Sequence, residues 1–197
     1  MDTFTLLASP WWVNLLFLVP FIAYWSWRKN RLELTWQVLI IAGIFGIAFG
    51  FVEASVVVYL RAAVGLLPGY GGTLSEVANL SAGFYQQAQI LTELPKSLVT
   101  VEFFREAATM IMLISISLLA TKKRAERFAI FLWTFAAWDI FYYVGLKATV
   151  GWPTSLLSPD VLFLIPVPWL GQVWFPVLVS LFSMLAIALS RKSGTNS

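Results

Sequence analysis

Five long apolar stretches, separated by shorter polar segments, dominate the pattern of hydrophobic and polar positions along the chain. Each approaches or exceeds the roughly 20 residues that a helix needs to cross the hydrocarbon core of a bilayer. The short alternating segments typical of a transmembrane barrel do not occur in the sequence. The pattern predicts an all-α, polytopic integral membrane protein with five transmembrane helices, at residues 11–27, 38–60, 97–120, 128–146 and 170–189.

We expect the five helices to form one transmembrane domain over residues 1–192, followed by a polar tail at 193–197. The first outer loop, residues 61–96, contains Thr73 and Glu76 at the spacing of a capping box. Apolar residues then recur at helical spacing, which predicts an amphipathic helix. We expect this helix to lie in the outer membrane interface, packed on the outer ends of the spans, or both.

The second outer loop, residues 147–169, is also longer than a simple connection requires. Ser158, Pro159 and Asp160 resemble the start of a helix. The apolar segment that follows them is much too short to cross a bilayer. We therefore predict a short interfacial or re-entrant turn in this loop.

Basic residues indicate the orientation, because the cytoplasmic loops of membrane proteins are enriched in Lys and Arg. Of the 13 Lys and Arg residues, most fall at three alternate span ends. This distribution predicts an outside N-terminus, an inside C-terminus and a retained first helix, in a bacterial or archaeal cytoplasmic membrane (the cell inner membrane of bacteria). The basic residues concerned are Arg28, Lys29, Arg31, Lys122, Lys123, Arg124, Arg127, Arg191 and Lys192.

Tryptophans cluster near the predicted span ends, which is typical of the aromatic belts at the two membrane interfaces. The chain has 10 Trp, and only Trp138 lies in the middle of a predicted span. We expect the others, including Trp27 at the inner interface and Trp152 at the outer one, to belong to these belts.

The composition supports a membrane protein and excludes several kinds of chemistry. Hydrophobic residues make up 59% of the chain and charged residues 12%, whereas soluble domains have about 25% charged residues. The chain has no Cys and no His, which excludes ordinary haem, Fe–S and zinc ligation as well as Ser-His and Cys-His catalysis. We predict no cofactor. No basic patch with interleaved aromatics indicates a nucleic-acid partner.

Four acidic residues lie inside the apolar stretches: Glu53, Glu102, Glu106 and Asp139. A charged side chain near the bilayer centre costs ~2.5–3.5 kcal/mol on insertion scales, and such residues usually mark functional sites. From the helical rise, Glu53 and Asp139 lie roughly 10 Å and Glu106 roughly 13 Å below the outer edge. The sequence therefore predicts that three helices bring acids to a common level.

The neighbouring residues predict that these acids face the interior of the helix bundle. On the second span, Gly46, Gly50 and Ala54 form a stripe of small residues that allows close helix approach, and Glu53 lies beside it. On the third span, Glu102, Arg105 and Glu106 share one side by helical spacing. On the fourth span, Tyr142 and Tyr143 lie one turn after Asp139 and can hydrogen-bond to it.

The predicted cluster has more negative than positive charge. Arg105 is its one certain cation, so about three carboxylates lack partners, and crowded like charges in a poorly solvated site cannot all ionise. Some acids are then protonated, or a cation lies among them, or outside water enters, or a neighbouring subunit supplies Arg or Lys. Because the ligands are oxygens, a metal at Glu53, Glu106 and Asp139 would be a hard cation.

Simpler explanations remain for three of the four acids. Glu102 and Arg105 are also explained as an i, i+3 pair that orders the start of a helix. Glu53 and Asp139 are also explained as isolated protonated acids that bond backbone carbonyls.

We consider three functions. The first, which we prefer, is a non-catalytic accessory subunit of a larger membrane complex, in which the cluster binds a partner, a proton or a small cation. The second is a proton- or cation-coupled transporter or binding protein, and the third is a membrane enzyme that acts on a lipid or quinone headgroup. The inner half offers few polar residues for a transport path, only Ser115, Ser117 and Thr134 on the third and fourth spans, and this favours the first function.

Overall fold

The computed structural model describes residues 7–63 and 96–192, and this part of the chain is mostly helical. Helices α2, α5 and α6 are long and apolar enough to cross a membrane, and α7 is a shorter apolar helix. The prediction of a helix-rich membrane protein is confirmed at this level. In chain order the elements are η1 (Trp11–Leu18), α1 (Val19–Asn30), α2 (Trp36–Ala63), α5 (Lys96–Ala120), α6 (Arg124–Val150), β1 (Pro159–Phe163), β2 (Trp169–Gln172) and α7 (Trp174–Ser190).

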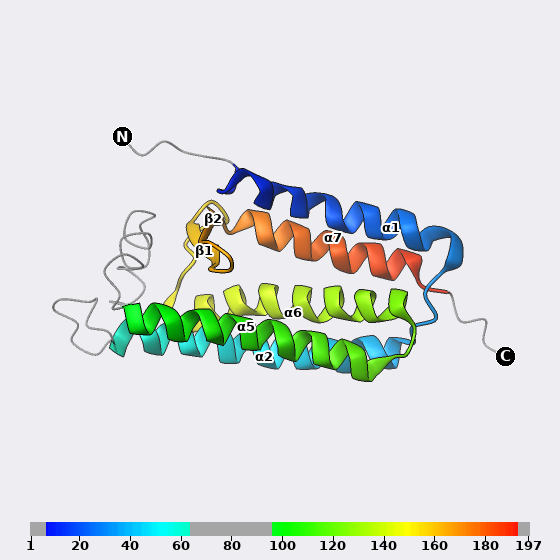
Figure 1. Ribbon diagram of the computed structural model, residues 1–197, viewed down its shortest axis with the longest axis horizontal. Helices are drawn as coiled ribbons and strands as arrows, with labels where there is room; N and C mark the ends of the chain where they lie inside the picture. Colours follow the sequence, from blue (N-terminus) through cyan, green and yellow to red (C-terminus); the bar gives the residue numbers. More distant parts are fainter. Residues whose placement is uncertain (1–6, 64–95, 193–197) are drawn as a thin grey trace.

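Helix α6 is the centre of the bundle, since α2, α5 and α7 all pack against it. Helix α1 packs on α7, so the α1–α7 pair covers one side of α6 while α2 and α5 lie on the other (Figure 1). The first predicted span begins as the 3-10 helix η1 and becomes α-helical at Val19, with Pro20 in the first turn of α1. Proline is tolerated there because the first helical N–H groups have no intrahelical acceptor.

The contact between α2 and α6 is unusually close. A Cβ atom added at Gly50 would lie 2.5 Å from the carbonyl oxygen of Trp138, and one at Gly46 would lie 2.7 Å from the Cβ atom of Ala137. Ala54, the third residue of the predicted stripe, is fully buried. The structure confirms that this stripe is the surface on which the two helices meet.

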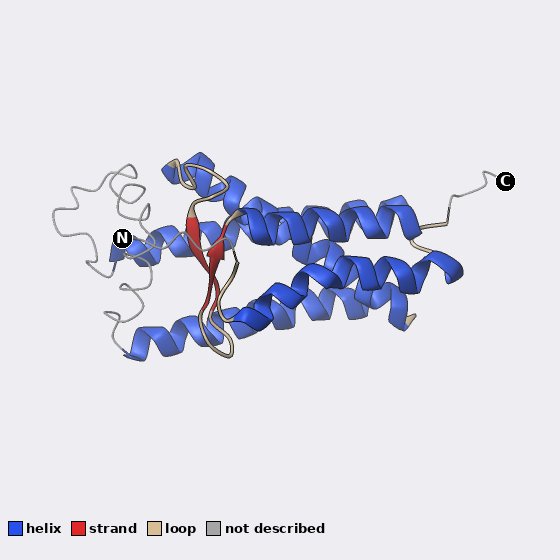
Figure 2. Ribbon diagram, turned by 90° about the horizontal axis from the view of Figure 1, so that it is seen from above, coloured by secondary structure: helices blue, strands red, loops and turns tan. Residues whose placement is uncertain are grey.

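A β-hairpin, formed by the antiparallel strands β1 and β2, follows α6. Figure 2 shows the two strands of the hairpin running across the direction of the helices. The predicted helix start at Ser158, Pro159 and Asp160 is therefore wrong, because Pro159 and Asp160 open β1 and pair with β2. The cross-strand partners come from residues 169–172, so the register could not be seen in the local sequence. The predicted fifth span is correspondingly shorter, since α7 begins at Trp174.

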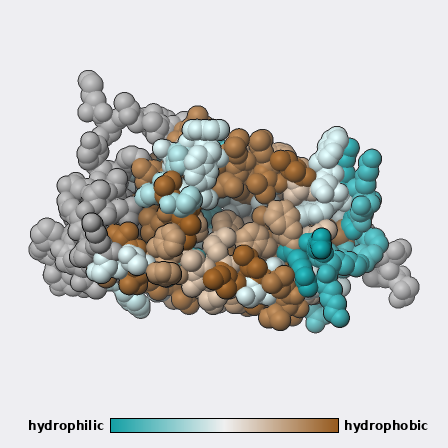
Figure 3. Space-filling model, viewed as in Figure 1, coloured by the Kyte–Doolittle hydropathy of each residue, from teal (hydrophilic) through white to brown (hydrophobic). Residues whose placement is uncertain are grey.

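At the opposite end of the bundle from the hairpin, the α1–α2 and α5–α6 connections meet the end of α7 (Figure 1). The backbone of Leu32 bonds with that of Ser190 and that of Lys192, each at 2.9 Å. Glu33 forms ion pairs with Lys123 and Lys192. Figure 3 shows hydrophilic residues gathered here and hydrophobic ones over the middle of the bundle. We call this region the basic end, because it carries the nine Lys and Arg residues named above as the predicted cytoplasmic ones.

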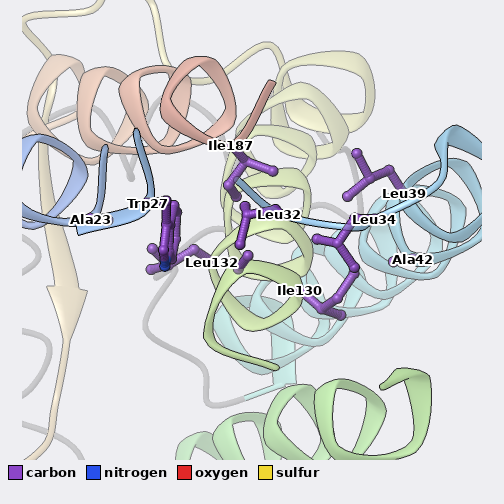
Figure 4. Close-up of a cluster of buried hydrophobic side chains, with 10 residues drawn as sticks. Ala23, Trp27, Leu32, Leu34, Leu39, Ala42, Ile130, Leu132 and Ile187 are labelled. Carbon is purple, nitrogen blue, oxygen red and sulfur yellow. The ribbon is translucent and has the colours of Figure 1, made fainter. Parts of the chain in front are cut away.

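A core cluster lies just inside the basic end and joins α1, α2, α6 and α7. Figure 4 shows Trp27, Leu39, Ile130 and Ile187 converging there from these four helices. Trp27 is thus a core residue and not part of a lipid-facing belt, and Trp152, which is fully buried, packs in a second core cluster. Both corrections have the same cause: an indole near a helix end fills the space between helices as readily as it faces lipid. The predicted amphipathic helix of the first outer loop lies outside the described residues.

Candidate functional site

Three of the four intramembrane carboxylates converge on the guanidinium group of Arg105. Its Nη1 atom donates to Glu53 of α2, and its Nε atom donates to Glu102 at 2.8 Å. Its Nη2 atom lies 4.0 Å from the carboxylate of Glu106. We call Glu53, Glu102, Arg105 and Glu106 the Arg105 cluster. The guanidinium fork suits this arrangement, because its five N–H donors point in several directions within one plane.

The sequence explains how the Arg105 cluster forms. Glu102, Arg105 and Glu106 lie three and four residues apart, so α5 presents them on one side. Glu53 lies on α2, the helix whose glycine stripe packs on α6. Thr109, one turn after Arg105, places its hydroxyl oxygen 3.4 Å from Glu53. The prediction that acids of the second and third spans meet is confirmed.

The acids of the Arg105 cluster are buried within the protein. Glu53 and Glu102 are each 7% exposed, and the side chain of Arg105 is 21% exposed. Glu106 also touches the hairpin, because the backbone N–H of Leu164 donates to its carboxylate at 2.8 Å. Three carboxylates and one guanidinium carry a formal charge of minus two when all are ionised.

Asp139 lies apart from the Arg105 cluster. Its Oδ2 atom accepts a hydrogen bond of 2.9 Å from Ser180 of α7. The other oxygen, Oδ1, accepts no hydrogen bond from the described residues. No ion pair joins Asp139 to Arg105 within the described part of the chain. We call Asp139, Ser180, Tyr143 and Asp160 the Asp139 group.

The tyrosines next to Asp139 do not complete the network in the predicted way. Tyr143 donates its hydroxyl to Asp160 at 3.0 Å, and Asp160 also accepts from the backbone N–H of Val161. The Tyr142 ring packs edge-on against Tyr143, with centroids 4.9 Å apart. Neither tyrosine has a described hydrogen bond to Asp139.

The acids that were predicted to form one cluster therefore lie in two separate groups. Glu53 and Glu106 meet at Arg105, whereas Asp139 faces α7, so the three acids proposed as ligands of a hard cation do not assemble. Within residues 7–63 and 96–192, no three acidic side chains are placed to hold a metal ion together. The cause lies in the helix faces: Asp139 and Glu53 lie on helices that touch, but they point toward different neighbours.

Two polar residues of these groups were not predicted from the sequence. Ser180 lies on α7 three residues before Ser183, a short polar stripe on a helix that is otherwise apolar. Asp160 could not have been found, because its place beside Tyr143 depends on the fold of the hairpin.

A cavity of about 290 Å³ lies beside the Asp139 group. Its walls come from η1, α1, α5, α6, the hairpin and α7, so it lies between the α1–α7 pair and the α5–α6 pair. Most of the lining is apolar, and aromatic rings are common in it. Asp139 and Ser183 also line the cavity.

No family model, no curated protein and no solved structure matches the chain. The class of the protein therefore rests on its own fold and site. It is a mostly helical protein with three candidate membrane spans among the described residues, and an acidic cluster around one arginine joins two of them.

Proposed function

We propose that the protein is a non-catalytic accessory subunit of a larger membrane complex, and that the Arg105 cluster binds a cationic group of a partner subunit. The observation that carries this proposal is the imbalance of charge at the cluster. Among the described residues, Glu53, Glu102 and Glu106 surround a single guanidinium, which leaves two formal negative charges in a poorly solvated place. A buried charge without a partner is strongly unfavourable, so an Arg or Lys from another chain would stabilise the cluster.

The position of α5 supports docking at this cluster. Among the candidate spans, α5 is the least buried against the rest of the chain. Large apolar side chains of α5 face outward, among them Phe104 at 65% and Ile111 at 63% exposure. A partner helix lying on α5 would cover this apolar surface.

A transport function has less support. The polar residues toward the basic end, Ser115, Ser117 and Thr134, donate their hydroxyls to carbonyl oxygens of their own helices. Such local bonds leave no chain of polar groups between the Arg105 cluster and the basic end within the described residues. A cluster without such a path fits binding better than conduction.

We also propose that the basic end lies in the cytoplasm, which places the hairpin and the Arg105 cluster toward the outside. The excess of Lys and Arg at the basic end supports this orientation under the positive-inside rule. The partner group would then reach the cluster from the outer half of the membrane.

Purification at native expression level in a mild detergent tests the accessory role. We expect the tagged wild-type protein to bring a defined set of membrane proteins with it, and Glu53→Gln combined with Glu106→Gln to lose them while remaining folded. Glu33→Gln, which removes an acid at the basic end, is the matched control and should keep the partners. A wild-type protein that purifies alone, together with an ion flux in liposomes that the double variant abolishes, would replace this proposal with the transporter.

A further inference from the structure

We propose that the cavity beside Asp139 binds a hydrophobic organic cation, that is, a small apolar molecule with one amine or ammonium group. This site is separate from the Arg105 cluster and does not depend on the accessory role. The inference rests on three properties of the cavity: its size, its aromatic walls and the buried carboxylate of Asp139 in its lining.

The size of the cavity fits a small molecule. An engineered apolar cavity of about 150 Å³ holds one benzene molecule. At about 290 Å³, this cavity is close to the lower limit of ordinary ligand pockets, which begin at roughly 300 Å³. By the same proportion it has room for roughly eleven heavy atoms.

The walls are mainly apolar and rich in aromatic side chains. Phe131, Phe135 and Trp138 come from α6, Phe163 and Trp169 from the hairpin, and Phe175 from α7. The negative faces of aromatic rings attract cations, and this attraction strengthens where water is excluded. Aromatic walls therefore accept both the apolar body of such a ligand and its charged group.

One buried polar group at the cavity lacks a complete set of partners. Asp139 is 7% exposed, and its only described hydrogen bond, from Ser180, goes to Oδ2. Buried polar groups are normally satisfied, so each such exception calls for an explanation.

The chemistry of Asp139 selects the class of ligand. A carboxylate offers acceptor oxygens only, so it binds a donor, and a positively charged donor binds most strongly. No Lys or Arg is among the residues that line the cavity. The ammonium group of a ligand would therefore donate to the carboxylate of Asp139, while the apolar part of the ligand would fill the space between the aromatic rings.

Equilibrium dialysis with the full chain in lipid nanodiscs tests the proposal, with empty nanodiscs subtracted as background. The probes are 4-phenylbutylamine, its alcohol analogue and its carboxylate analogue, which differ only in the polar group. For the wild-type protein we expect the amine to bind at least about tenfold more tightly than the alcohol, and the carboxylate not to bind. Equal binding of amine and alcohol, or no binding of the amine, would overturn the inference.

Two variants locate the site. Asp139→Asn keeps the shape of the side chain, so we expect it to lose the preference for the amine while still binding the alcohol, which also shows that the cavity is intact. Val179→Phe places a ring in the cavity and should remove the binding of both probes. Glu33→Gln is the control and should bind the amine as the wild type does. Amine binding that survives both cavity variants unchanged would show that the amine occupies another place.

Discussion

Arg105 of α5 and Glu53 of α2 form a largely buried ion pair that connects two helices, both of which pack on α6. The pair links residues 52 positions apart in the chain. Two further carboxylates share the same guanidinium. Among the described residues, Arg105 is thus the positive group that allows three acids to lie together between apolar helices.

Replacing Arg105 should cost much more stability than replacing an exposed cation. We expect Arg105→Gln to lower the free energy of unfolding by about 3–5 kcal/mol, because the acids around it would be left without compensation. Lys122→Gln, a change at an exposed residue, should stay within about 0.5 kcal/mol of the wild type. Titration with SDS in mixed micelles, followed by circular dichroism, measures both values.

The same experiment can isolate the pair itself. Combining Glu53→Gln with Arg105→Gln should destabilise the protein by less than the sum of the two single changes, with a coupling energy of about 1–3 kcal/mol. Additive effects would mean that Arg105 and Glu53 do not stabilise each other.

Helix α2 should tolerate a methyl group at one of its glycines, Gly43, and not at another, Gly50. We expect Gly50→Ala to lower the free energy of unfolding by about 1–3 kcal/mol, because its Cβ atom would meet the backbone of α6. Gly43→Ala is the matched control, since its Cβ atom would meet only the Trp133 side chain, at 3.2 Å. The unfolding measurement described above applies here too, and similar values for the two variants would contradict the close α2–α6 contact.

The ion pairs of Glu33 at the basic end should make stability depend on pH. Hydrogen bonds and charge attraction from Lys123 and Lys192 lower the pKa of Glu33 from 4.5 to about 2. Since this pKa is lower in the folded state, the stabilisation is fully present above about pH 4.5 and is lost as the pH falls toward 2.

The comparison of wild type with Glu33→Gln isolates this contribution, because all other acids are shared. The difference in unfolding free energy between the two should be constant above about pH 5 and shrink below pH 4.5. Added salt should reduce it as well, because Glu33 is exposed. A difference that stays constant down to pH 2 would show that Glu33 is not paired in solution.

The orientation can be tested by chemical labelling, because the chain has no Cys of its own. Leu157→Cys, at an exposed position of the hairpin connection, should react with a membrane-impermeant maleimide in intact cells. Lys122→Cys, at the basic end, should react only after the membrane is permeabilised. The opposite pattern would reverse the proposed topology.

The sequence predicted the elements well where a single physical requirement decided them. A bilayer demands long apolar helices, so α2, α5 and α6 were found to within a few residues. The glycine stripe was also visible, because close packing needs small residues at helical spacing. The hairpin could not be predicted, since the partners of β1 lie across a turn. A Pro next to an Asp is also compatible with the start of a strand as well as with the start of a helix.

The Arg105 cluster could be predicted from the sequence, whereas the surroundings of Asp139 could not. Spacing along α5 placed Glu102, Arg105 and Glu106 on one side, and the stripe on α2 pointed to Glu53 beside it. Asp139 could be placed at a depth but not toward a neighbour, because depth follows from helical rise while direction depends on which helix packs on which face.

The sequence by itself determined that this chain is helical and apolar, that it buries acids, and that its cations gather at alternate span ends. Only the tertiary structure decided that the acids divide into an arginine-centred cluster and a separate aspartate beside an aromatic cavity. The physical reason is that periodicity fixes the side of a helix on which a residue lies, whereas the partner on that side comes from segments far away in the chain.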